Sequence, residues 1–154
     1  MSTKREDPGP QAAVSPGRAQ ASSITRRIVE AVTGRARLGD PVRVLGLTGP
    51  PGTGKTTIAD ELAHALPEAG LPVAGLAPMD GFHMSNALLA ARGLADHKGA
   101  PDTFDVGGYV ALLGRVRRGD AVVLAPDYRR DLHEPVAASL PIEIDGVVIT
   151  EGNY

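Results

Sequence analysis

Apolar and polar residues follow one another along the chain in a strand, helix, strand order. The near-continuous apolar run at residues 42–48 predicts a short strand that is buried on both faces. A helical pattern comes next, with apolar residues at Ile58, Leu62, Ala65 and Leu66, and it ends at Pro67. Residues 71–78 predict a second strand. A connection of this length implies that the two strands are parallel, with a right-handed crossover.

The flanking segments extend the same pattern. Ser22 or Ser23 can cap a helix that precedes the first strand and carries Ile24, Ile28, Ala31 and Val32 on one face, with residues 34–41 ending it. A short helix is expected near residues 85–92. Asp105 can cap a longer helix, whose inward-facing residues would be Val106, Tyr109, Val110, Leu113 and Val116.

The rest of the chain completes the prediction of an α/β fold. Residues 121–125 and 146–150 predict strands, whereas residues 126–141 are expected to form a loop. Residues 1–21 are polar and rich in Pro, Gly and Ala, so they predict a disordered tail ahead of one domain at 22–154. The expected architecture has three layers, with helices on both faces of a parallel sheet.

The stretch between the first strand and its helix spells GPPGTGKT, which fits the phosphate-loop pattern G-x-x-x-x-G-K-[ST]. Backbone N–H groups of such a loop and of the following helix converge on a polyphosphate, and glycines let the backbone come close. The predicted fold class is therefore a P-loop NTPase. The predicted nucleotide-binding residues are Gly49, Pro50, Pro51, Gly52, Thr53, Gly54, Lys55, Thr56 and Thr57.

Composition narrows the function classes further. The formal net charge is −2, so neither nucleic acid nor an anionic membrane is expected as the main partner. The chain has no cysteine, which excludes zinc–thiolate sites and a disulfide framework and suits a cytoplasmic protein. No apolar run approaches the length of a membrane-spanning helix.

Acidic residues follow two of the predicted strands. Asp80 comes after the second strand and Glu151 after the last one, and the carboxyl ends of parallel strands share one edge of a sheet. Phosphoryl transfer needs phosphate clamps, Mg²⁺ ligands and a base for the attacking hydroxyl. Lys55, Thr56 with Glu151, and Asp80 can fill these roles, which predicts ATP and Mg²⁺ as cofactors. Either acid could instead be a turn residue, because each is followed by glycine.

Four sequence blocks carry a resemblance to a known family. Residues 79–86, 98–105, 126–135 and 148–154 resemble the phosphoribulokinase/uridine kinase/pantothenate kinase family in order and in spacing. The resemblance covers about residues 42–154 and implies a kinase that transfers the γ-phosphate of ATP to a small-molecule alcohol. A nucleoside, a pantothenate-like alcohol and a sugar all remain open as the acceptor.

The resemblance also implies roles for individual residues. Asp80 matches the acid that takes the proton of the acceptor hydroxyl, and Glu151 matches the acid near Mg²⁺. The positions that match contacts to the acceptor are Tyr128 and His133, together with Lys98, Asp102, Phe104 and Asp105 in a block that closes over it. His83 could contact the substrate or only pack. Arg129 stands where many relatives have an acid.

Three further expectations follow. One alternative function is an AAA+-like mechanochemical ATPase, although the strand GVVITEG lacks the paired Asp-Glu that such enzymes need. A second alternative is a nucleotide-binding remnant without turnover. Family members continue beyond this point with a lid and more strands, in the strand order 2-3-1-4-5. The chain is therefore expected to have an incomplete sheet with residues 42–48 at an edge, marginal stability, little activity and a possible homodimer through that edge.

Overall fold

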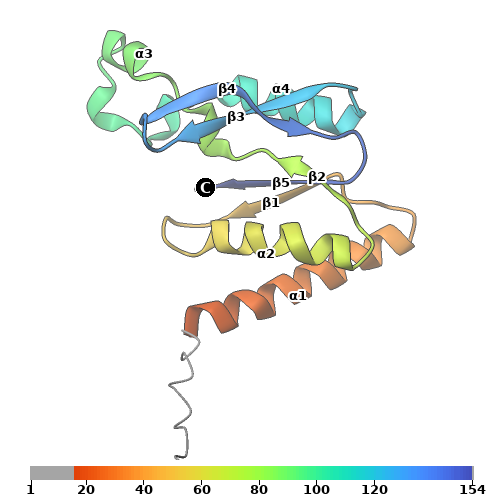
Figure 1. Cartoon of the computed structure of the whole chain (residues 1–154). Helices are drawn as coiled ribbons and strands as arrows, with labels where there is room; N and C mark the ends of the chain where they lie inside the picture. Colours follow the sequence, from red (N-terminus) through yellow and green to blue (C-terminus); the bar gives the residue numbers. More distant parts are fainter. Residues whose placement is uncertain (1–15, 154) are drawn as a thin grey trace, which may run out of the picture.

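The computed structural model describes residues 16–153, with side chains from Ser23 onward. Its elements form three layers, with a parallel sheet between a pair of helices on one face and a helix and a β-hairpin on the other (Figure 1). The predicted α/β architecture is confirmed. None of the helices in the described part of the chain combines the length and the apolar character that crossing a membrane requires.

The central sheet contains three parallel strands in the order β1-β5-β2. They are β1 (Val44–Thr48), β5 (Val147–Gly152) and β2 (Val73–Leu76), and all three were predicted, with slightly different bounds. Because β5 lies in the middle, its side chains are buried on both faces from Val147 to Thr150. Strand β1 has one paired neighbour among the described strands, as expected for residues 42–48.

One face of the sheet is covered by α1 (Pro16–Arg37) and α2 (Lys55–Glu68), which lie side by side. The buried residues of this layer are Val32, Ala59, Leu62, Leu66, Val147 and Ile149. Helix α1 begins at Pro16, so the predicted cap at Ser22 or Ser23 is wrong; proline is well tolerated in the first turn of a helix. The tail predicted for residues 1–21 otherwise falls on residues 1–15, which lie outside the described residues.

The opposite face is covered by α4 (Val106–Arg118) and by a hairpin of β3 (Val123–Arg129) and β4 (Glu134–Ile142). Asp105 caps α4 as predicted, since its carboxylate accepts a hydrogen bond from Gly108 N at 2.9 Å. The predicted inward positions are only partly right. Leu112 and Val116 are buried, whereas Val106 and Val110 are 57% and 62% exposed, because the face of α4 that carries them extends past β1, where no further strand lies among the described residues.

The hairpin corrects the prediction that residues 126–141 form a loop. Strands β3 and β4 pair antiparallel from Val123 opposite Ile142 to Arg129 opposite Glu134. The prolines in this segment favoured the prediction of a loop, because proline cannot donate a hydrogen bond to a neighbouring strand. Pro126 falls where the register shifts between Ala125 and Asp127, and β4, which carries Pro135 and Pro141, has β3 as its one ladder partner among the described strands.

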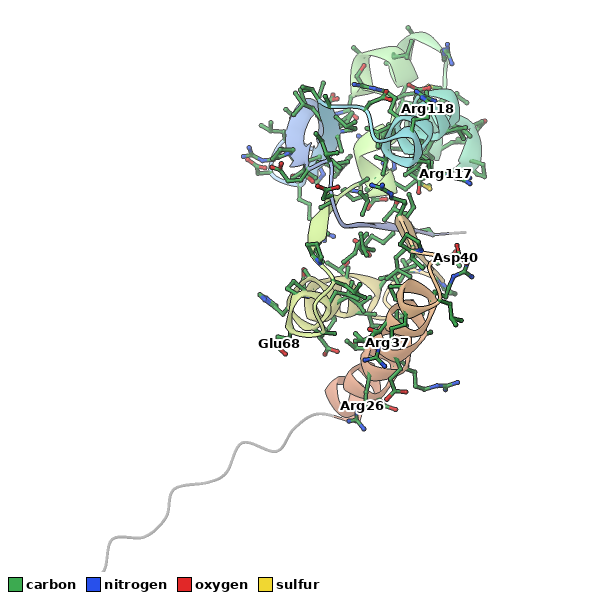
Figure 2. All side chains as sticks on the ribbon, turned by 90° about the vertical axis from the view of Figure 1, so that its right-hand side faces the viewer. Arg26, Arg37, Asp40, Glu68, Arg117 and Arg118 are labelled. Atoms are coloured by element: carbon green, nitrogen blue, oxygen red, sulfur yellow. The ribbon has the colours of Figure 1, made fainter. Side chains whose placement is uncertain are left out.

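Short elements connect β2 to α4. They are the 3₁₀ helices η1 (Met79–Phe82), η2 (Ala95–His97) and η3 (Pro101–Thr103), and the expected short helix α3 (Asn86–Ala91). Figure 2 looks at the end of the molecule where α1, α2 and α4 finish, marked by Arg37, Glu68 and Arg118. The loop between β1 and α2 lies at the opposite end, where the three parallel strands point.

Candidate active site

Residues 49–57, here called the phosphate loop, connect β1 to α2 and include the first turn of that helix. Gly52 and Gly54 have φ angles of 77° and 85°, which only glycine adopts without strain. At Gly49 an added Cβ would lie 3.2 Å from Thr53 Oγ1, so the loop folds tightly on itself there. The loop therefore has the backbone geometry that the motif predicts, and the N-terminal N–H groups of α2 begin beside it.

Lys55, the first residue of α2, bends back over this loop. Its Nζ donates hydrogen bonds to the carbonyl oxygens of Gly49 at 2.8 Å and Pro50 at 2.9 Å. The cation thus stands at the mouth of the loop, held by two carbonyls that a phosphate oxygen can replace. Pro51 and Thr57 are exposed on the surface of the loop, and Thr53 Oγ1 donates to Pro50 O at 2.8 Å.

Thr56 and Glu151 come together from distant parts of the chain. Thr56 Oγ1 lies 3.0 Å and 3.2 Å from the two carboxylate oxygens of Glu151, at the end of β5. A hydroxyl and a carboxylate are the hard oxygen ligands that suit Mg²⁺, which commonly keeps several waters and takes the rest of its shell from substrate phosphates. Within residues 16–153, no group of three His, Cys, Asp or Glu side chains is arranged to hold a metal by itself. The pair fits a magnesium ion that arrives with a nucleotide.

Asp80 lies in η1, directly after β2. The following Gly81 does not have a positive φ, so the Asp-Gly pair is not there for a turn that needs one. Instead, an added Cβ at Gly81 would lie 2.3 Å from Pro126 O and 3.2 Å from Asp127 N. Glycine is required because η1 packs directly on the backbone of β3, and this contact brings Asp80 beside the hairpin.

Asp80, Thr56, Glu151 and Tyr128 line one cavity of about 300 Å³. The predicted base, the predicted metal ligands and one predicted acceptor contact therefore share a single space next to the phosphate loop. The cavity lies between α2, the carboxyl ends of β2 and β5, and the hairpin, as expected for an α/β sheet.

A second group of predicted residues forms the wall beyond Tyr128. The ring of His83 packs against Phe104 with centroids 4.0 Å apart and against Tyr128 at 5.1 Å. Lys98 Nζ lies 5.2 Å from the centre of the Tyr128 ring. His83 Nδ1 is also 2.8 Å from Asp80 O, so this aromatic group supports the segment that carries the candidate base.

Two predicted contacts lie farther out. Asp102 is exposed in η3, and His133 is exposed at the hairpin turn with a φ of 52°. The backbone of His133 nevertheless contributes, because its carbonyl accepts hydrogen bonds from Asn86 Nδ2 at 3.1 Å and Lys98 Nζ at 2.5 Å. The two regions 86–98 and 133 are thereby joined across the outer side of the cavity.

Arg129, which stands where many relatives have an acid, forms an ion pair with a nearby residue. Its guanidinium donates to the carboxylate of Asp131 at 2.7 Å and 2.9 Å. These hydrogen bonds lower the pKa of Asp131 below its ordinary value and raise the pKa of Arg129. Arg129 thus pairs at the exposed tip of the hairpin and is not among the residues that line the cavity.

Three charged residues of the cavity wall were not predicted from the sequence, namely Asp60, Asp127 and Arg130. Asp127 lies in β3, and Arg130 is the turn residue directly after this strand. The position of Asp127 in a strand was missed when residues 126–141 were interpreted as a loop. Asp60 lies one helical turn after Thr56 on α2, a spacing that could have identified it.

A strand, glycine loop and helix of this geometry, with an acid at the end of the adjacent parallel strand, define a P-loop nucleotide-binding fold. A family model described as AAA domain matches residues 27–95, which include the phosphate loop. The protein named "Uncharacterized protein YggC" from Escherichia coli K12 is 43% identical over 114 residues, covering 72% of this chain and 46% of that protein. A pantothenate kinase from Limosilactobacillus reuteri is 35% identical over 113 residues, covering 71% of this chain and 36% of that enzyme.

A solved structure agrees with these relatives. The protein from Silicibacter sp. TM1040 named "putative fructose transport system kinase" superimposes with a TM-score of 0.69 and 34% identity, covering 92% of this chain and 65% of that one. The chain belongs to the phosphoribulokinase/uridine kinase/pantothenate kinase family of P-loop proteins. It spans about half the length of the curated relatives it matches, or less.

Proposed function

We propose that this chain carries the phosphate-binding and acceptor-binding residues of an ATP-dependent kinase that phosphorylates an alcohol group of a small molecule. The observation that carries the proposal is the shared cavity, where Asp80 and Tyr128 face the same space as Thr56 and Glu151. A hydroxyl in that cavity would lie between a carboxylate able to take its proton and the loop that would hold the γ-phosphate.

Each residue has a defined role in this reaction. The N–H groups of the phosphate loop and Lys55 bind the β- and γ-phosphates and offset their charge. Asp80 accepts the proton of the acceptor hydroxyl as its oxygen bonds to the γ-phosphorus, and the bond from that phosphorus to the β,γ-bridging oxygen breaks. The products are ADP and a phosphate ester.

Thr56 and Glu151 would hold Mg²⁺, which when bound neutralises charge on the phosphates. These two residues also hold the elements that carry them in position. The 3.0 Å contact between Thr56 Oγ1 and Glu151 Oε1 fixes the start of α2 against the end of β5, so the phosphate loop and the acceptor cavity stay in register.

The names of two relatives favour two chemical kinds of acceptor without excluding nucleosides. One relative is named a pantothenate kinase, and another is named a putative kinase of a fructose transport system. As acceptors, we therefore rank pantothenate-type alcohols and sugars above nucleosides. Small polar acceptors of this kind fit a cavity of about 300 Å³ that is lined by several charged side chains. We place the enzyme in the cytoplasm, where ATP is abundant.

The AAA+ alternative has less support at the end of β5. Mechanochemical ATPases need a second acid directly before the glutamate, and this chain has Thr150 there. Thr150 is 5% exposed, and its Oγ1 donates to Ala77 O at 2.6 Å and lies 2.7 Å from Tyr109 OH. The position is therefore part of the packed interior.

The proposal can be tested by transfer of labelled phosphate from γ-labelled ATP to a panel of pantothenate, hexoses and nucleosides, since product labelling detects even slow turnover. Asp80→Asn should lower transfer to the accepted substrate by about 10²–10⁴-fold, the usual contribution of a positioned base. Its affinity for Mg-ATP should change little, because Asp80 lies on the acceptor side.

Asp145→Asn is the matched control, since this exposed acid lies near Arg43, Leu71 and Pro72, at the other end of the sheet. Release of ADP that never depends on any acceptor would contradict a kinase and favour an ATPase. Full phosphate transfer by the Asp80→Asn variant would remove Asp80 from the mechanism.

A further inference from the structure

Arg130 is the one basic residue that lines the cavity with Asp80 and Glu151, as far as the structure describes the chain. The other charged residues of the cavity wall are all acids, namely Asp60, Asp80, Asp127 and Glu151. Arg130 lies in the turn that connects β3 to β4. This turn is at the same end of the molecule as the phosphate loop, so the hairpin brings a guanidinium to the edge where the parallel strands end (Figure 1).

The Arg130 side chain forms no polar contact within the fold. Its neighbour Arg129 is held by Asp131 at 2.7 Å and 2.9 Å. Among the side chains described from Ser23 onward, by contrast, no carboxylate lies within ion-pairing distance of Arg130, and no oxygen accepts a hydrogen bond from it. Arg130 is also exposed. Its N–H groups are therefore available to a molecule that enters the cavity.

A free arginine in this place has a definite chemical preference. The guanidinium stays charged at physiological pH, and its planar fork of N–H donors matches the oxygens of a carboxylate or a phosphate. An anionic group elsewhere in this cavity would meet only carboxylates and be repelled. Arg130 thus marks the place in the cavity where an anionic group of the acceptor can be held. A neutral acceptor would give Arg130 no ionic partner.

We infer that the acceptor is a hydroxy acid, and that Arg130 binds its carboxylate while its hydroxyl lies at Asp80. The inference rests on the proposed function and narrows it, because it favours an acidic alcohol over a neutral sugar or a nucleoside. Leu76, Tyr128 and Leu140 line the same cavity and suit the carbon chain that joins the two polar groups. The carboxylate is unchanged by the reaction, since the hydroxyl alone loses its proton to Asp80 and gains the γ-phosphate. Arg130 would therefore determine specificity.

The test uses pairs of acceptors in which a neutral CH₂OH group replaces the carboxylate. The pairs are glycerate with glycerol, gluconate with glucitol, and pantothenate with pantothenol. Calorimetry on the full chain, with Mg²⁺ and a non-hydrolysable ATP analogue, gives their dissociation constants without the need for turnover. At least one acid should bind about ten- to a hundredfold more tightly than its neutral partner, as expected for hydrogen bonds to a charged group.

Arg130→Gln should remove this preference by weakening the acid alone, while the neutral partner and the ATP analogue bind as before. Arg130→Lys should restore only part of it, because lysine keeps the charge and loses the planar fork. Arg129→Gln is the matched control, since Arg129 is the adjacent arginine and is not among the residues that line the cavity. It should keep the full preference for the acid.

Several results would overturn the inference. They are the absence of binding by every acid, equal binding of both members in every pair, and a preference that survives Arg130→Gln. Fructose 6-phosphate and fructose form a further pair, and a preference confined to that pair would replace the carboxylate by a phosphate. If Arg130→Gln slowed phosphate transfer to acidic and neutral acceptors by the same factor, Arg130 would act on the transferred phosphate and not on the acceptor.

The failure of the proposed function would look different. Labelled phosphate would then reach no acceptor of any charge, and release of ADP would not depend on an acceptor. Transfer to neutral acceptors alone, with a loss of transfer in Asp80→Asn, would leave the proposed function standing. In that case only the assignment of a hydroxy acid to Arg130 would fail.

Discussion

The two sides of the candidate active site are built in different ways. The phosphate side is one continuous stretch, residues 49–57, completed by Glu151 from β5. The acceptor side combines η1, the segment 98–105 and the hairpin, which are connected by ring contacts and by backbone hydrogen bonds such as Met84 N to Thr103 O at 2.8 Å. One side depends on local backbone geometry, and the other depends on packing between segments.

This difference has consequences for mutation. On the phosphate side, the groups that matter are backbone N–H groups, Lys55 and the Thr56–Glu151 pair, and the Lys55 side chain can be removed without moving its neighbours. On the acceptor side, Asp80, His83 and Tyr128 keep their places because η1 and β3 touch. A change that separates those two elements should therefore affect stability and acceptor binding together.

The largest effect is expected at Lys55, which we compare with Lys98, the other lysine among the described residues. Lys55→Ala should lower turnover by about 10²–10³-fold or more and weaken ATP binding, because it removes a charge at the γ-phosphate. The melting temperature should change little, since Lys55 contacts only two loop carbonyls. Lys98→Ala should leave the affinity for ATP unchanged. It should raise the KM for the acceptor about fivefold, because it removes the contacts of Lys98 with His133 O and with the Tyr128 ring.

Calorimetry with Mg-ATP and a kinetic separation of kcat from KM distinguish the two lysines. If Lys98→Ala weakened ATP as strongly as Lys55→Ala, the site would not divide into two sides. A Lys55→Ala protein with ordinary ATP affinity would mean that the loop does not bind phosphates.

The next largest effect is expected at a glycine. Gly81→Ala would place a methyl group 2.3 Å from Pro126 O, so η1 and β3 must separate. We expect a loss of about 1–3 kcal/mol in the free energy of unfolding, the usual cost of overpacking, together with weaker acceptor binding. Chemical denaturation followed by circular dichroism measures the first quantity.

Gly114→Ala is the matched control for this change. Gly114 lies within α4, and its added methyl group would meet only the end of the Arg118 side chain, at 3.4 Å. Alanine should stabilise the helix by about 0.5–1 kcal/mol. Destabilisation of equal size by both variants would show that the close approach at Gly81 has no special role.

The same contrast explains how far the sequence predicts this molecule. The strand 42–48, the phosphate loop, the helix after it and the cap at Asp105 were all predicted, because each depends on neighbours in the sequence. The edge position of β1 was also foreseen, although it came from the strand order of the family and not from a local pattern.

What escaped prediction depends on tertiary contacts. The hairpin was missed because the prolines at 126, 135 and 141 are typical of loops. Only the pairing of β3 with β4 shows that these strands tolerate them. Val106 and Val110 fit a helical stripe, yet they are exposed because that face of α4 extends past β1. Asp127 of β3 and Arg130, in the turn after it, line the cavity because the hairpin packs beside η1, which is a contact between segments that no local pattern indicates.

A smaller effect is expected where the two sides meet. Tyr109 OH of α4 lies 2.7 Å from Thr150 Oγ1, next to Glu151. Tyr109→Phe should lower the free energy of unfolding by about 1 kcal/mol, since Thr150 keeps its hydrogen bond to Ala77 O. The Thr56–Glu151 pair should stay intact, so ATP affinity measured by calorimetry should not change. A large loss of ATP binding would show that Tyr109 positions Glu151 and does more than pack.

The smallest effect is expected at the tip of the hairpin. Arg129 lowers the pKa of Asp131 by hydrogen bonding, so Arg129→Ala should raise that pKa toward its ordinary value, as measured by an NMR titration of the carboxyl group. The Arg129–Asp131 pair contributes to stability at a pH above the ordinary pKa of an aspartate. This contribution is lost as the pH falls through the lowered pKa of Asp131. Because both side chains are exposed, the melting temperature should scarcely move. The acceptor KM should stay within about twofold, as is usual for surface substitutions, since Arg130 and not Arg129 lines the cavity. A large rise in that KM for Arg129→Ala would mean that Arg129 leaves Asp131 when the acceptor binds, and the acceptor side would then extend to the tip of the hairpin.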